Sequence, residues 1–256
     1  TKSSTPPMLS RTVLITGAAR GIGWETAKAF AGLPDWNVIA LDKSFDKSFD
    51  KSFDHNNNNI TTFTYDLRQR TPQDFQRLVD SLPPIDTLVN NAGTLHCPPP
   101  DGLANGDGLG FTVAQVDDIL DVNLRAPVGL IEALSPQMMK RQEGRIVNVG
   151  SVSAFTGHPD LWYGASKAGL LNITKTFASL LGKFNVTCNA VAPGPTLTDM
   201  YASLPQSRKD MVERTVNSGR PAHPAEVAET ILWLGVTAPL YVNGSTIDVN
   251  DSSYPR

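Results

Sequence analysis

Short apolar runs rich in β-branched residues recur along the chain, and segments with helical spacing lie between them. Most of these runs lack strict alternation of apolar and polar positions, which is typical of strands covered on both faces. The helical segments include GIGWETAKAFAG, TPQDFQRLVDSL, YGASKAGLLNITKTFASLL and one long segment over residues 113–139. This alternation predicts an α/β fold with three layers, a doubly wound parallel sheet of the Rossmann-like type. The predicted strands begin at Thr12, Asn37, Ile60, Asp86, Arg145, Asn185 and Ser245.

Polar and Pro/Gly-rich segments mark the limits of this pattern. Residues 1–10 are expected to form a flexible leader, and residues 11–256 a single domain with a cofactor half over about 11–150 and a catalytic and substrate half over about 151–256. The unit DKSF occurs three times in tandem from Asp42. Because these copies are far shorter than solenoid repeats, they predict a flexible polar insertion. Residues 96–110 predict an irregular loop at the mouth of a site.

Composition narrows the classes of function. The net charge of −3 leaves no basic excess for nucleic acid, and no apolar stretch reaches the roughly 18 residues of a membrane span. Only Cys97 and Cys188 are present, so neither a disulfide framework nor a metal site is expected. These features favour a cytoplasmic protein that acts on a small molecule and binds no membrane.

A glycine-rich segment lies between the first predicted strand and the first predicted helix. It reads TGAARGIG and carries Gly17, Gly21 and Gly23. Gly17 permits a tight turn, Gly21 lets the backbone approach a pyrophosphate, and Gly23 lets the helix pack on the strand. The helix N-terminus supplies N–H groups for phosphate. The segment predicts a dinucleotide-binding turn; on the motif alone, an ordinary glycine-rich turn is the alternative.

An acidic residue follows the second predicted strand. Asp42 comes 19 residues after Gly23, close to the spacing of about 20 expected of an acid that binds a ribose 2′-hydroxyl. Its charge favours NAD, because a carboxylate repels the 2′-phosphate of NADP. Arg20 and Lys43 would attract that phosphate, so NADP stays an alternative. Asp42 would otherwise only begin a turn.

The segment YGASK carries the sharpest chemical signal. On a helix Tyr163 and Lys167 stand at positions i and i+4 and share a face. A nearby ammonium would favour the phenolate and lower the pKa of Tyr163, making it a usable acid or base. Alone, such a pair is more often an ordinary surface pair, so its meaning depends on the other motifs.

Taken together, the motifs resemble those of the short-chain dehydrogenase/reductase (SDR) family, in the family's usual order across nearly the whole chain. The matching segments are TGAARGIG, YDLR, NNAG, DVNLRAP, IVNVGSVS, YGASK and PGPTLT. By this resemblance the catalytic residues are Asn123, Ser151, Tyr163 and Lys167. The residues implied in cofactor binding are Gly17, Arg20, Gly21, Ile22, Gly23, Asp42, Asp66, Leu67, Asn91, Ala92, Gly93, Tyr163, Lys167, Pro193, Gly194, Thr196 and Thr198.

The resemblance implies oxidoreduction of a secondary alcohol or ketone with NAD or NADP, without a metal. Tyr163 would act as the acid or base, and Ser151 would hydrogen-bond the substrate oxygen. Lys167 would hold the nicotinamide ribose and tune Tyr163, and Asn123 would support a relay water through its backbone. Family members commonly form homodimers or homotetramers, in which Ala165, Ala168 and Gly169 would permit close packing; these small residues could equally pack within one chain.

Individual assignments leave alternatives open. Ser153 also lies near Tyr163, but Ser151 is preferred because it directly follows a predicted strand. Asn90 and Asn91 fit a structural role as readily as a contact role. His96, His158 and His223 have no carboxylate or cysteine at ligand spacing, so they are predicted to be surface or loop histidines, with His158 near the substrate as an alternative.

One segment departs from the family pattern, and a second segment bears on which substrate the protein takes. Asn250, Asp251 and Ser252 replace the commoner acid-Gly-Gly ending. The segment 196–224 is expected to form much of a substrate lid. If its basic residues face the pocket, an anionic substrate is favoured; if Met200 and Tyr201 do, a hydrophobic alcohol or cyclic ketone is favoured.

Two other functions are weaker hypotheses. A catalytically silent dinucleotide-binding sensor or scaffold would use the same fold, but the intact Ser151, Tyr163 and Lys167 argue against it. A methyltransferase with a related glycine turn would leave YGASK unexplained.

Overall fold

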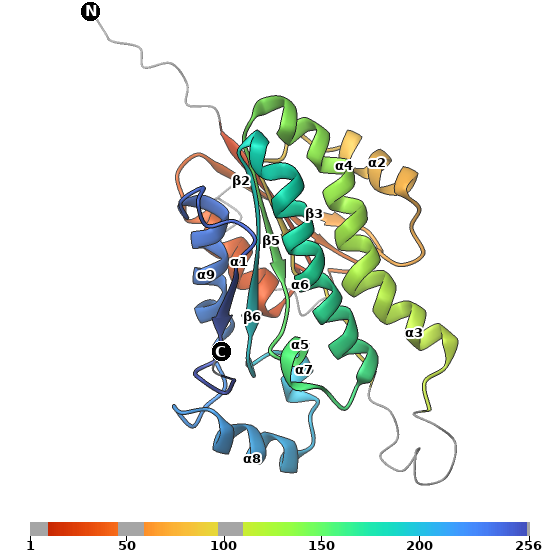
Figure 1. The fold of residues 1–256 in the computed structure, drawn as a ribbon, viewed down its shortest axis with the longest axis vertical. Coiled ribbons are helices and arrows are strands. Elements are labelled where there is room, and N and C mark those ends of the chain that lie inside the picture. The colour runs from red at the N-terminus through yellow and green to blue at the C-terminus, as the bar shows by residue number, and fades with distance from the viewer. Residues whose placement is uncertain (1–9, 46–58, 97–109, 255–256) are drawn as a thin grey trace, which may run out of the picture.

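A computed structural model describes residues 10–45, 59–96 and 110–254 of the chain (Figure 1). Most of the DKSF repeat, Cys97 and most of the 96–110 loop lie outside these ranges, as does nearly all of the predicted leader. Within them the strands form one seven-stranded sheet in the order β3-β2-β1-β4-β5-β6-β7, and every neighbouring pair is parallel. The strands are β1 Arg11–Thr16, β2 Trp36–Asp42, β3 Ile60–Thr64, β4 Thr87–Asn90, β5 Gly144–Val149, β6 Val186–Pro193 and β7 Thr246–Val249.

Helices cover both faces of this sheet, which gives the three layers predicted from the sequence. In Figure 1, α4 and α6 lie on one side of the strands and α1 and α9 on the other. The α-helices are α1 Gly21–Ala31, α2 Pro72–Asp80, α3 Val113–Leu120, α4 Ala126–Arg141, α5 Ser153–Thr156, α6 Leu161–Leu181, α7 Asp199–Ala202, α8 Gln206–Thr215 and α9 Pro224–Val236. A π-helical turn, η1 Asp121–Arg125, and a 3₁₀ turn, η2 Gly182–Phe184, complete the regular structure.

Two hydrophobic cores explain why the strands lack alternation. Leu14 packs in one core with Phe75 of α2 and Leu130 of α4. Its neighbours Val13 and Ile15 point to the opposite face and join the second core, formed with α1 and α9. Successive strand residues face opposite sides, so a strand buried on both faces must be apolar at both sets of positions.

The chain order reverses between β1 and β4, which are neighbours in the sheet although β2 and β3 come between them in sequence. β2 and β3 extend the sheet to one side of β1, while β4 to β7 extend it to the other. Doubly wound sheets bind ligands in the crevice beyond the carboxyl ends of the strands at this switch point. The segments TGAARGIG and NNAG leave the sheet there, after β1 and β4.

The predicted long helix over residues 113–139 is interrupted rather than continuous. A capping box of Thr112 and Gln115 starts α3, and the turn η1 separates α3 from α4. Pro127, near the start of α4, has no N–H, so the α-helical bond to the carbonyl of Asn123, four residues earlier, cannot form. The π turn therefore lies where the sequence removes a helix donor. Among the helices that the structure describes, none is long and apolar enough to cross a membrane.

Candidate active site

The glycine turn after β1 is held by the side chain of the residue that directly follows β4. Gly17 and Gly21 have φ angles of 64° and 57°, a region in which side chains other than glycine are strained. Asn91 donates its side-chain Nδ2 to the carbonyl oxygens of Thr16 and Gly17, both at 3.0 Å. Asn91 therefore shapes the turn through its side chain, in keeping with the structural role left open above.

The start of α1 fits the pyrophosphate of a dinucleotide. Arg20, at the N-cap, is extended and makes no side-chain cap, and no acidic residue stands in the first turn. The helix N–H groups at this end therefore have no competing carboxylate from their own turn, and the helix dipole favours an anion there. A Cβ on Gly23 would lie 2.2 Å from the Gly17 carbonyl oxygen, so only glycine lets helix and turn approach this closely. Ile22 packs against the core behind them.

Asp42 lies at the carboxyl end of β2, beside this turn. Its Oδ2 accepts a hydrogen bond from the backbone N of Ala19 at 3.0 Å. Arg20 makes an ion pair with Asp199 at 3.0 Å, and both side chains are about two-thirds exposed. Asp42 is thus fixed against the turn, whereas Arg20 is held only by an exposed pair, which contributes little.

Asp66 and Leu67 differ in which of their atoms can reach a ligand. Arg68 forms an ion pair with Asp66 at 2.5 Å, and this hydrogen bond holds the pKa of the Asp66 carboxyl down at about 2. The carboxylate of Asp66 remains partly exposed. The side chain of Leu67 is buried in the core, so only its backbone is placed to meet a ligand.

The turn after β6 closes over the glycine segment. Gly194 follows Pro193, the last residue of β6. A Cβ on Gly21 would meet Thr198 Cγ2 at 3.2 Å, so Thr198 lies against the turn that follows β1. Thr196 is buried and donates from Oγ1 to the carbonyl oxygen of Gly194 at 3.0 Å. The segment that follows β6 and the first glycine turn therefore face each other across the carboxyl edge of the sheet.

Three hydroxyl groups meet where β5 ends. Ser151 and Ser153 are buried, and their Oγ atoms lie 2.5 Å apart. Burial raises the pKa of the Tyr163 phenol, and hydrogen bonding from Ser151 and Ser153 acts in the opposite direction and partly offsets it. Sequence reasoning placed Ser151 here and treated Ser153 only as its rival, whereas the structure brings both to Tyr163.

Lys167 lies beneath this cluster, one helical turn after Tyr163. Its side chain is only 3% exposed, and Nζ donates to the carbonyl oxygen of Val149 at 2.7 Å. Burial lowers the pKa of Lys167 to about 8. Nζ also lies 5.8 Å from the centre of the Tyr163 ring.

The prediction that Lys167 lowers the pKa of Tyr163 is wrong for this arrangement. The pKa of the Tyr163 phenol is raised, chiefly by burial and also by the nearby charge of Asp160, and Lys167 is not among its causes. A phenol removed from water resists ionisation, and spacing along a helix does not report that burial.

Asn123 is fully buried in the π turn, next to Lys167. Its Oδ1 accepts from the backbone N of Thr94 at 2.8 Å, and its Nδ2 donates to the carbonyl of Thr94 and to Ser166 Oγ. A Cβ on Gly93 would lie 3.4 Å from Lys167 Nζ and 3.6 Å from Asn123 Oδ1. The segment that follows β4 thus runs against both residues, with Ala92 packed partly into the core behind it.

His96, His158 and His223 lie in loops, as predicted. His96 Nε2 also lies 2.8 Å from Asp118 Oδ2 of α3, a partner that its spacing in the sequence does not indicate. The two residues are 22 positions apart, and only the fold brings them together. The His158 ring centre lies 5.1 Å from that of Tyr163. His223 precedes α9, and its backbone N donates to Glu226 at 2.7 Å.

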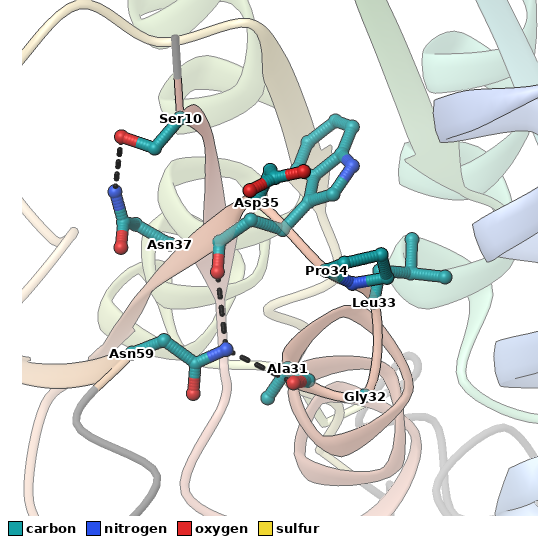
Figure 2. A pocket seen from close by; sticks show the side chains of 9 residues that line it. Ser10, Ala31, Gly32, Leu33, Pro34, Asp35, Asn37 and Asn59 are labelled. Atoms are coloured by element: carbon teal, nitrogen blue, oxygen red, sulfur yellow. Dashed lines mark hydrogen bonds between the residues drawn. The ribbon is translucent and has the colours of Figure 1, made fainter. Parts of the chain in front are cut away.

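An open pocket of about 510 Å³ lies at the other end of the strands (Figure 2). Asn59 lines it and donates from Nδ2 to the carbonyls of Ala31 and Trp36. None of the predicted site residues lines this pocket. Within the described ranges no group of three or more His, Cys, Asp or Glu side chains is placed to hold a metal ion.

Comparison with known proteins gives the family. The sequence model described as short chain dehydrogenase matches residues 11–209. The chain is 34% identical over 242 residues to 3-oxoacyl-(acyl-carrier-protein) reductase FabG of Thermotoga maritima, covering 93% of this chain and 95% of that protein. It is 33% identical over 246 residues to nodulation protein G of a Rhizobium species, covering 95% and 96%.

A solved structure agrees in fold over nearly the whole chain. It is that of a putative 2-deoxy-D-gluconate 3-dehydrogenase from Agrobacterium tumefaciens with bound NADP, with a TM-score of 0.82, 25% identity and coverage of 97% of this chain and 98% of that one. The chain belongs to the short-chain dehydrogenase family. It is an oxidoreductase that uses NAD or NADP to interconvert an alcohol and a carbonyl compound.

Proposed function

We propose that Tyr163 is the general acid and base of this oxidoreductase, acting on a secondary alcohol or a ketone. The observation that supports this most is the meeting of the Tyr163 phenol with the hydroxyls of Ser151 and Ser153 directly above buried Lys167. The phenol is the only group of this cluster that both exchanges a proton and has two hydroxyl partners to direct it.

The chemistry divides between the bound dinucleotide and the chain. A nicotinamide held beside the turn after β6 supplies the hydride acceptor or donor. In oxidation Tyr163 takes the hydroxyl proton of the substrate, and in reduction it returns one. Ser151 holds the substrate oxygen by a hydrogen bond and thereby aligns it with the phenol. A positively charged Lys167 favours the ionised form of any acidic group that lies close to it.

Asn123 would support the proton transfer by holding a relay water through its backbone carbonyl. Because Pro127 cannot donate to the Asn123 carbonyl in the α-helical manner, that carbonyl is suited to accept a hydrogen bond from a water. The side chain of Asn123 is held by Thr94 and Ser166, so the backbone at this turn is fixed. We assign Asn123 this role through its carbonyl.

For the cofactor we propose NAD as the preferred dinucleotide. The carboxylate of Asp42, held by Ala19 N beside the glycine turn, suits a ribose diol and repels a phosphate. The solved relative with bound NADP supports the alternative, for which Arg20 is the nearby cation. Turnover with NAD and NADP separates the two: Asp42→Ser is expected to reduce the preference for NAD, and a parent protein that prefers NADP would contradict the assignment.

The proposed cofactor contacts divide the residues by role. Gly17, Gly21 and Gly23 shape the turn, Arg20 and Ile22 flank its phosphate-facing end, and Asp42 meets the ribose. The remaining proposed contacts, at the adenine side and at the nicotinamide side, are Asp66, Leu67, Asn91, Ala92, Gly93, Tyr163, Lys167, Pro193, Gly194, Thr196 and Thr198.

The side chains of the predicted lid and the names of the relatives indicate which classes of substrate to test. Lys209 of α8 donates to the carbonyl of Ala202 at 2.8 Å, so this cation stabilises the lid itself. Met200 and Met211 are exposed on α7 and α8. The Thermotoga relative is named a 3-oxoacyl-(acyl-carrier-protein) reductase, and the solved relative is named a putative 2-deoxy-D-gluconate 3-dehydrogenase. We therefore propose to test a panel of 3-oxoacyl compounds, sugar acids and simple secondary alcohols as substrates.

We further propose a cytoplasmic homodimer or homotetramer, with residues 11–256 folding as one domain. Large apolar side chains are exposed on the single chain, among them Trp233 of α9 and Leu240 and Tyr241 in the loop before β7. Ala165 and Ala168 on α6 are also exposed, whereas Gly169 packs towards Leu124 of the same chain. Light scattering of the purified protein measures the assembly.

The function is tested by following the absorbance of reduced nicotinamide. The panel is run in both directions with the parent protein and with Tyr163→Phe, and cofactor binding is measured separately by calorimetry. Loss of the phenol is expected to lower kcat by about a hundredfold to ten-thousandfold while cofactor binding remains. A variant as active as the parent would contradict the role of Tyr163, and binding without turnover across the panel would favour the silent sensor.

A further inference from the structure

Asp160 is a buried carboxylate at the very start of the helix that carries Tyr163. Its side chain is 0% exposed. It caps α6: Oδ1 accepts from the backbone N of Tyr163 at 2.9 Å. Its own backbone N donates to His158 Nδ1 at 3.1 Å. In the ranges that the structure describes, no lysine or arginine forms an ion pair with it. The carboxylate is therefore compensated by N–H groups and by the positive end of the helix dipole.

The second oxygen of this carboxylate reaches a different part of the sheet. Oδ2 accepts from the backbone N of His96 at 2.7 Å, across 64 positions of sequence. A helix N-cap requires only one side-chain oxygen to accept from a backbone N–H of the first turn. Here both oxygens are used and both are buried, so the side chain joins α6 to the segment that leaves β4.

That segment is also tied to α6 at a second point. Thr94 is bonded through both its backbone N and its carbonyl to Asn123. Asn123 in turn donates to Ser166 Oγ, and Ser166 donates to the carbonyl of Tyr163. The two ties reach α6 at Asp160 and Ser166, on either side of Tyr163.

We propose that Asp160 is a positioning residue of this active site, which fixes the backbone of Tyr163 against the segment Thr94–His96 by bridging their two N–H groups. The proposal rests on the assignment of Tyr163 as the acid and base. Loosening the bridge displaces the phenol from Ser151 and Ser153, and a small displacement of a reacting group costs much of the rate.

Two substitutions separate the bridge from the cap. Asp160→Ser keeps a short side chain that can accept from Tyr163 N but cannot reach His96 N. Asp160→Asn keeps the shape, but its amide offers one acceptor oxygen and no charge. Thr71→Ala is the matched control, because Thr71 caps α2 with a capping box and its side chain hydrogen-bonds with Asp74 of the same helix.

Kinetics in the direction of alcohol oxidation give the first readout. We expect Asp160→Ser to retain most of the parent's Tm while kcat falls about tenfold to a hundredfold and cofactor affinity is unchanged. Thr71→Ala is expected to lower Tm and leave kcat at the parent value. An Asp160→Ser variant with the parent's kcat would reduce Asp160 to a helix cap and overturn the proposal.

The pH profile gives a second readout, which a loss of stability alone would not move. The charged or titratable side chains around Tyr163 are Asp160, Lys167 and His158. The charge of Asp160 contributes to raising the pKa of Tyr163, so its removal in Asp160→Asn is expected to shift the acid limb of kcat/KM for oxidation to lower pH. A limb that stays in place or moves to higher pH contradicts a direct influence of Asp160 on the phenol, and with it the positioning role.

Hydrogen–deuterium exchange decides the point without any turnover. In the parent, amides of peptides covering Thr94–His96 and Tyr163 are expected to exchange slowly. In Asp160→Ser the His96 peptide exchanges faster while the Tyr163 peptide stays protected. Equal protection of the His96 peptide in parent and variant overturns the bridge. Absence of parent activity on every substrate overturns the proposed function instead, so the two failures are distinguishable.

Discussion

The contact between the glycine turn and α1 makes Gly23→Ala a severe substitution. The added Cβ would lie 2.2 Å from the Gly17 carbonyl oxygen and 2.5 Å from Asn91 Nδ2, well inside the 3.0 Å that real Cβ atoms keep from such neighbours. Neither atom is the end of a flexible chain free to swing away, because Asn91 is itself bonded to Thr16 and Gly17. The turn and the helix must therefore move apart.

The cost follows from two effects. Overpacking of this kind costs about 1–3 kcal/mol, and loss of the two Asn91 hydrogen bonds costs about 1 kcal/mol each. The expected decrease in the free energy of unfolding is about 3–5 kcal/mol. The gain in helix propensity from alanine, at most about 1 kcal/mol, is smaller. Because the turn is the proposed pyrophosphate site, NAD binding should weaken as well.

Gly32→Ala is the matched control on the same helix. Gly32 has a φ of −73°, and its Cβ would meet only Ala29 O at 3.5 Å and Lys28 O at 3.6 Å, which are ordinary contacts. It should be neutral or stabilise by about 0.4–1 kcal/mol. Urea unfolding gives both free energies and calorimetry gives the affinity for NAD. A Gly23→Ala protein as stable as Gly32→Ala would refute the packing argument.

Three further predictions concern buried charge, backbone strain and a buried polar network. Burial lowers the pKa of Lys167 from 10.5 to about 8; between these values the unfolded chain holds the proton more tightly, so the contribution of Lys167 to the free energy of unfolding should rise with pH by on the order of 3 kcal/mol. The difference between the unfolding free energies of the parent and Lys167→Met across that window measures this rise, and a constant difference would contradict it. Ser252 has a φ of 55°, so Ser252→Gly should stabilise by about 0.5–1 kcal/mol; a lower Tm would contradict this. Asn148 accepts from Asn90 at 2.9 Å in the buried sheet, so Asn148→Ala should destabilise by about 2–4 kcal/mol, and a loss in urea unfolding no larger than that of an exposed asparagine would show the network to be dispensable.

The C-terminal segment shows which properties can be read from the sequence and which require the structure. The replacement of acid-Gly-Gly by Asn250, Asp251 and Ser252 is visible in the sequence, but its consequence is not. Asp251 and Ser252 both have positive φ, a region that favours glycine. Asp251 Oδ2 accepts from Ser218 N and so holds the segment after α8.

The sequence by itself predicted most helices and strands, the parallel sheet and the segments that carry the candidate site residues. Burial on both faces makes strands continuously apolar, and a glycine turn or a Tyr-x-x-x-Lys pair is local enough to be recognised from spacing. Tyr163 and Lys167 could be paired on that basis, whereas Ser151 was named only through the resemblance to the family.

Only the tertiary structure decided the partners and the electrostatics. It joined Ser153 to Tyr163, Asp160 to His96, and His96 to Asp118, and it interrupted the predicted long helix with a π turn around Asn123. It also reversed the expected direction of the pKa of Tyr163. Such properties depend on which side chains meet across long stretches of chain and on how much water reaches them, and neither is encoded in the local period of the sequence.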